Sequence, residues 1–156
     1  MLKILFILLL MPLHAVAEWN YSNTEQWTVT KDKLFVESML YNAAAQVFFV
    51  DGQSYVRVIS ATDTCSRKGD KNGERNFVAS VFADEKTINE AQPVNMKSIC
   101  ISEGRAVIYP VSDRGHQYIL NLLKVSQVIS IETILFSAKN FTSAYNQART
   151  TSLKAL

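Results

Sequence analysis

The densest group of charged side chains lies in the segment 66–75. Four of these residues are basic: Arg67, Lys68, Lys71 and Arg75. A cluster of this kind can bind an anion or an acidic partner. Asp70 and Glu74 stand among the basic residues and reduce the positive field. The four cations are therefore predicted to form either a binding site or a solvated surface loop, and the mixed charge favours the loop.

The chain contains two cysteines, Cys65 and Cys100. In an oxidising compartment an even pair most simply forms one structural disulfide. A redox role would need a CxxC motif, and a metal site would need further cysteine or histidine ligands. Because the sequence has neither, we predict a Cys65–Cys100 disulfide, no metal and no cofactor.

Residues for catalysis are sparse. His116 is the one histidine after residue 17, and it follows Ser112 and Asp113 too closely for the three to form a catalytic relay. GxSxG, HExxH and phosphate-loop motifs do not occur. We predict that His116 is an exposed loop residue and that the protein is not an enzyme.

The N-terminus has the three parts of a secretory signal peptide. Lys3 gives a positive start, an apolar run follows from Ile4 to Leu13, and Ala15-Val16-Ala17 supplies small residues for cleavage. The apolar run is shorter than the roughly 18 residues that span a bilayer. We predict a signal peptide over 1–17 and a periplasmic or secreted domain over 18–156.

The net charge of the chain is +2, which is close to zero for 156 residues. Nucleic-acid-binding proteins carry a strong basic excess, so that class of partner is not expected. The length suits one domain, large enough to bury a hydrophobic core.

The elements that must position these residues are mostly strands. Two runs rich in Val, Phe, Tyr and Ile flank Asp51-Gly52, which predicts a central β-hairpin over 45–61. Further strands are predicted at 27–30, 34–40, 77–83, 94–102, 105–111 and 128–136, with helices at 117–125 and 141–148. The expected fold class is mainly β, an antiparallel β-sandwich or barrel of about eight strands with one or two short helices.

Aromatic residues gather near the start of the predicted domain, at Trp19, Tyr21 and Trp27. They could form a binding surface or pack across the sheet, and core packing is the commoner fate of a Trp near a strand.

The second half of the chain carries a series of segments in a recognisable order: 96–100, 104–108, 118–124 and 136–145. This series resembles the invasion-associated locus B family of exported bacterial proteins. Asn140 stands where that family has a Gly, and the family's early cysteine is missing. The resemblance implies an exported β-sandwich without catalytic residues, so no site residue is transferred from it.

Three classes of function remain open. The first is a non-catalytic interaction domain whose partner is another protein of the bacterial envelope, and an exposed apolar patch would support it. The second is an inhibitor or immunity protein that blocks a hydrolase with the loop of Arg67 and Lys68. The third is a carrier of a small apolar ligand, which requires a cavity in the fold. We rank them in this order.

Overall fold

The computed structural model describes residues 26–30, 33–38, 42–84 and 91–154, so the predicted signal peptide lies outside the described residues. Nine strands, two α-helices and one turn of 3-10 helix follow one another in this part of the chain. In chain order they are β1 (Thr28–Thr30), β2 (Lys33–Glu37), β3 (Ala43–Val50), β4 (Gln53–Ala61), η1 (Lys71–Gly73), β5 (Arg75–Ala83), β6 (Gln92–Ser102), β7 (Arg105–Pro110), α1 (Asp113–Val125), β8 (Val128–Ile131), β9 (Ile134–Ser137) and α2 (Phe141–Lys154).

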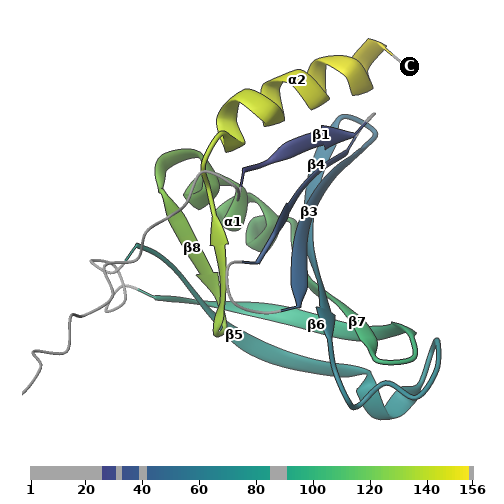
Figure 1. Ribbon diagram of the computed structural model, residues 1–156. Coiled ribbons are helices and arrows are strands. Elements are labelled where there is room, and N and C mark those ends of the chain that lie inside the picture. Colours follow the sequence, from purple (N-terminus) through teal and green to yellow (C-terminus); the bar gives the residue numbers. More distant parts are fainter. Residues whose placement is uncertain (1–25, 31–32, 39–41, 85–90, 155–156) are drawn as a thin grey trace, which may run out of the picture.

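All nine described strands belong to one antiparallel sheet, in the order β1-β2-β3-β4-β7-β6-β5-β8-β9. The sheet curls into a half-barrel (Figure 1). A bridge between Ser38, just after β2, and Phe136 in β9 brings its two margins together. The predicted mainly β class is confirmed, and the sheet is a single curled one.

The hairpin predicted around Asp51-Gly52 is present as β3 and β4. Asp51 has φ 49° and Gly52 has φ 77°, the pair of left-handed conformations that a tight two-residue hairpin turn requires. Every residue of β3 is paired with one of β4, from Ala43 opposite Ser60 to Val50 opposite Gln53. Val47, Val56 and other inward side chains of this hairpin are buried.

The single strand predicted over 128–136 is wrong, because the segment folds back on itself as β8 and β9. The turn falls at Glu132 and Thr133, and neither is one of the residue types Gly, Asn, Asp or Pro that usually indicate a turn. Glu132 adopts a left-handed φ of 59°. Its backbone N–H donates to the carbonyl of Ser80 in β5 at 3.0 Å, so pairing with a distant strand fixes the turn.

Helix α1 begins four residues earlier than the predicted 117, at Asp113. Ser112 is its N-cap, and the Ser112 hydroxyl accepts a hydrogen bond from the N–H of Gly115 at 3.2 Å. The prediction that His116 is an exposed loop residue is wrong, since it lies in this helix and only 7% of its surface is exposed. From sequence, the polar residues 112–116 are interpreted as a bend, because the residue types that cap helices also occur in turns.

Trp27 packs in the core, as expected for a Trp beside a strand, whereas Trp19 and Tyr21 lie outside the described residues. Its Nε1–H donates to the carbonyl of Ser137 at 2.8 Å. Its ring meets Phe141 of α2 edge to face, with 4.9 Å between the ring centroids. Trp27 therefore packs the segment just before β1 against the start of α2.

Both helices pack near one end of the half-barrel, which we call the helix end. Helix α1 lies within the curve of the sheet, and α2 crosses above β1 (Figure 1). Ile119, Leu120 and Leu123 of α1 are fully buried there. Neither helix of the described chain is long and apolar enough to cross a membrane. Neither α1 nor α2 contributes to the lining of the opposite end of the concave face, which we call the open end.

Candidate functional site

The predicted disulfide is confirmed. Cys65, in the loop after β4, is bonded to Cys100 of β6, with 5.5 Å between the Cα atoms. A methyl group added at Gly73 would lie 2.2 Å from Sγ of Cys100 and 2.8 Å from Sγ of Cys65. The 3-10 turn can approach the disulfide this closely only because residue 73 has no side chain.

The charged loop is ordered by its own hydrogen bonds. The buried carboxylate of Asp70 accepts from the backbone N–H of Ser66 at 3.0 Å and from the Ser66 hydroxyl. The N–H of Gly69 donates to the carbonyl of Cys100 at 2.9 Å. The loop is therefore bound to β6 by backbone as well as by the disulfide.

The four basic residues predicted as a site lie on two parts of the fold, the charged loop and the start of β5. Arg67, Lys68 and Lys71 are exposed on the loop. Arg75 lies in β5, where its guanidinium stands over the ring of Phe77, with 4.7 Å between Cζ and the ring centroid. Arg75 lines a pocket, and the other three are not among the residues that line it. A role for Arg67, Lys68 and Lys71 stays a prediction.

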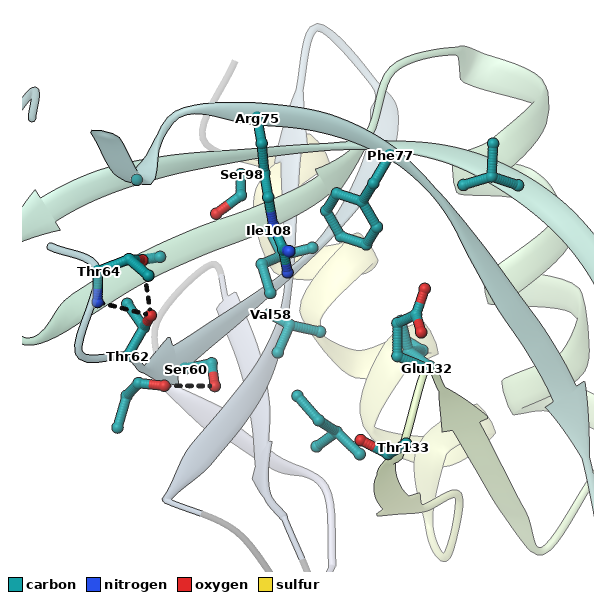
Figure 2. A pocket seen from close by; sticks show the side chains of 16 residues that line it. Val58, Ser60, Thr62, Thr64, Arg75, Phe77, Ser98, Ile108, Glu132 and Thr133 are labelled. Atoms are coloured by element: carbon teal, nitrogen blue, oxygen red, sulfur yellow. Dashed lines mark hydrogen bonds between the residues drawn. The ribbon is translucent and has the colours of Figure 1, made fainter. Parts of the chain in front are cut away.

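The pocket occupies the open end of the concave face and has a volume of about 510 Å³ (Figure 2). Small-molecule sites in proteins commonly have volumes of about 300–1,000 Å³. Part of its wall is apolar: Val58, Phe77, Ala106, Ile108, Ile131 and Ile134. Hydroxyl groups supply most of the polar part: Ser60, Thr62, Thr64, Ser98 and Thr133. We call this the open-end pocket.

Small inward side chains explain why the pocket is there. Along β4 the inward residues run from Val56 to Val58 and then to Ser60, and along β6 Met96 is followed by Ser98. Ala106 of β7 faces the same space. A hydroxyl or a methyl group fills less volume than the aliphatic side chains at the helix end, and no side chain of α1 or α2 fills the difference.

Two charged groups enter the open-end pocket from different elements. Arg75 extends into it from β5, and the carboxylate of Glu132 points into it from the turn between β8 and β9 (Figure 2). Neither forms an ion pair with another residue of the described chain. The ion pair between Glu74 and Lys97, with 2.7 Å between Oε1 and Nζ, lies next to Arg75 in sequence but is outside the pocket lining. The Lys97 ammonium hydrogen-bonds to Glu74 and lowers the pKa of that carboxyl.

A second hollow lies on the opposite face of the sheet, where β4 parts from β7. These strands pair only from Val58 opposite Ile108 to Ala61 opposite Arg105. The hollow, which we call the outer groove, has a volume of about 470 Å³. Its wall is largely apolar and aromatic, and includes Phe48, Val50, Tyr55, Ile99, Val107, Tyr109 and Val111. Val50 and Val111 are 47% and 59% exposed, so the groove adjoins an apolar patch.

His116 of α1 lies at the gap between β4 and β7. Its Nδ1 accepts a hydrogen bond from the N–H of Val56 at 3.1 Å, which it can do only while this nitrogen carries no proton. Burial lowers the pKa of His116, and the negative charge of Asp113 opposes that effect less strongly. The Ser112 hydroxyl is engaged as the helix cap. His116 thus takes the place of a strand partner for β4.

No three His, Cys, Asp or Glu residues within the described ranges lie close enough together to hold a metal ion. That the protein is not an enzyme stays a prediction.

Sequence reasoning named Arg75 as part of the charged loop and not of a pocket, and it did not select Glu132 or the hydroxyl groups of the pocket wall. One signal was present: alternation in 94–102 placed Ser98 on the same side as Val94 and Met96. A small polar residue on an otherwise apolar inward face marks a place where the core is not filled. Nothing in the sequence around Glu132 pointed to a turn.

The comparisons with known proteins identify no relative of this chain. No protein-family model matches the chain, and neither a curated protein nor a solved structure matches it significantly. The resemblance to the invasion-associated locus B family therefore stays a prediction.

Proposed function

We propose that this protein is an exported binding protein that holds a small organic molecule in the open-end pocket. The observation that carries the proposal is the pocket of about 510 Å³, whose wall combines apolar side chains, hydroxyl groups and two groups of opposite charge. Binding sites for small molecules combine a mostly apolar concave surface with a few polar groups that orient the ligand. Of the three classes expected from the sequence, the carrier is the one that requires such a cavity.

Support for export comes from two features. The sequence begins with the three parts of a signal peptide. The Cys65–Cys100 disulfide is the kind of bond that persists in oxidising compartments. We therefore place the binding activity in the periplasm or outside the cell.

A fluorescent dye tests the proposal directly. The dye 8-anilinonaphthalene-1-sulfonate has an apolar body and one anionic group, and it becomes fluorescent in an apolar site. We expect the wild type to bind one dye molecule per chain. Thr62→Trp places an indole ring at the partly exposed pocket wall and should lower the dye affinity about tenfold.

The matched control is Gln147→Trp, which adds the same ring to an exposed position on α2, away from the pocket. It should leave dye binding unchanged. Cooperative thermal unfolding of both variants shows that they are folded. Dye binding that Thr62→Trp does not change would contradict the proposal.

A second candidate function is binding of another envelope protein, and the outer groove is the observation that favours it. Exposed Val50 and Val111 beside aromatic Tyr55 and Tyr109 are typical of a protein-binding patch. A photo-crosslinking residue in place of Tyr109 should give one discrete adduct in intact cells. The same residue in place of Gln147 should give none. Equal labelling at both positions would argue against this function.

A further inference from the structure

We propose that the ligand of the open-end pocket is a dipolar molecule, with a carboxylate that binds Arg75, an ammonium group that binds Glu132 and an apolar body between them. This inference rests on the proposed function, and it adds the chemical class of the ligand.

The charges of the pocket wall are the first evidence. Among the lining residues that the structure describes, Arg75 and Glu132 are the only ionisable ones, and they have opposite signs. Neither is neutralised by an ion pair with a described residue. An anionic ligand alone would bind Arg75 and leave Glu132 without a partner in the pocket, whereas a dipolar ligand satisfies both.

Arg75 is held in an orientation suited to a carboxylate. Its guanidinium lies over the Phe77 ring at 4.7 Å, which leaves the edge of the planar group free to donate. Two parallel N–H donors on that edge match the two oxygens of a carboxylate.

Glu132 stands at a position where a glutamate is unfavourable for the fold. It has a φ of 59°, and the other described non-glycine residues with positive φ are Asp51, Asp84 and Asn140. Asp and Asn tolerate this conformation because of their short polar side chains, which Glu lacks. The backbone of Glu132 makes the turn's hydrogen bonds, to Ser80 and from Ser130, and these need no carboxylate. A carboxylate that points into a pocket from a residue with a strained backbone indicates a functional role.

The rest of the wall fits the body of such a ligand. Val58, Ile108 and Ile134 offer apolar surface. The hydroxyls of Ser98 and Thr133 can hydrogen-bond to an uncharged polar group such as an amide. Leucyl-leucine and trileucine carry both charged ends, apolar side chains and backbone amides, with two different spacings between the charges. Leucine, which has no amide, gives the shortest spacing.

The experiment measures displacement of 8-anilinonaphthalene-1-sulfonate from the wild type by these three compounds. At least one should displace the dye. For that compound, acetylation of the amine and amidation of the carboxyl should each weaken binding about tenfold, the effect of one lost charge-assisted hydrogen bond.

Two variants assign each charge to its residue. Glu132→Gln should weaken binding of the free compound about tenfold and leave the N-acetylated form unchanged. Arg75→Gln should do the same for the free compound and leave the amidated form unchanged. Glu103→Gln and Arg67→Gln are the matched controls, because both residues are exposed and outside the pocket lining, and neither should change binding.

Glu132→Gly separates the role of the side chain from that of the turn. Glycine adopts a positive φ without strain, so this variant should unfold at a temperature no lower than the wild type while losing affinity for the free compound.

The outcomes distinguish this inference from the proposed function. Dye bound in the pocket but displaced by none of the three compounds, or displaced equally by the blocked forms, overturns the dipolar ligand and leaves the binding protein intact. Dye binding that Thr62→Trp does not affect overturns the proposed function itself, and the inference with it.

Discussion

The two ends of the concave face are built from the same strands but are filled in different ways. At the helix end, Val56, Val81 and Met96 belong to the same hydrophobic core as the buried side chains of α1 and α2. At the open end, the inward positions of β4 and β6 hold Ser60 and Ser98, and the space beside them forms the pocket. The helix end is therefore filled by side chains of the hydrophobic core, whereas the open end leaves space for a pocket.

The largest effect on stability should come from a substitution in the core at the helix end. Phe136 is fully buried in β9, and Phe136→Ala should lower the free energy of unfolding by about 3–5 kcal/mol because it removes apolar contacts and leaves a cavity. Urea denaturation measures this loss. Val78, which is 59% exposed at the open end, is the matched control, and Val78→Ala should change stability by less than about 0.5 kcal/mol. Equal losses at the two positions would remove the distinction between the ends.

The disulfide should be the main source of stability at the open end. Replacing both Cys65 and Cys100 by Ala should lower the free energy of unfolding by about 3–4 kcal/mol in the chain-entropy model. Denaturation of the wild type with and without reductant provides the comparison. If reductant and the double substitution both leave the midpoint unchanged, the charged loop is held by its hydrogen bonds alone.

Gly73 tests how closely the 3-10 turn packs on the disulfide. Gly73→Ala places a methyl group in steric overlap with the sulfur atoms, 2.2 Å from Sγ of Cys100 and 2.8 Å from Sγ of Cys65. The turn must therefore move, at a cost of about 1–3 kcal/mol. The same substitution in the variant without Cys65 and Cys100 should have a smaller effect, because the sulfur atoms are gone. Thermal unfolding of the four proteins measures this coupling. Additive effects would contradict the contact.

The smallest effect concerns pH and the helix end. Burial lowers the pKa of His116 in the folded protein, so the unfolded chain binds this proton at higher pH. The stability contributed by neutral His116 is therefore complete above the ordinary histidine pKa of about 6.5 and falls as the pH drops through that value. Urea midpoints at pH 7.5 and 5.5 measure the loss. His116→Gln, which keeps an acceptor for the Val56 N–H, should reduce the difference between the two midpoints.

The sequence predicted the local parts of the fold well because their causes are local. Asp51-Gly52 fixes a hairpin by backbone conformation alone, and alternation of apolar residues marks β5, β6 and β7. The prediction was wrong where distant pairing decides the result. The β8–β9 turn at Glu132 depends on a hydrogen bond to Ser80, fifty-two positions earlier in the chain. His116 lies in a polar stretch and becomes buried only because β4 parts from β7 beside it.

The sequence by itself determined the class of the fold, the central hairpin and the disulfide. Each follows from residue types and spacings that act within a few positions, or from there being only two cysteines to pair. The tertiary structure decided where the core stops and the pocket begins. Arg75 and Glu132 share a pocket because β5 lies between β6 and β8 in the sheet. That order is set by side-chain packing across the whole half-barrel, which no short stretch of the chain encodes.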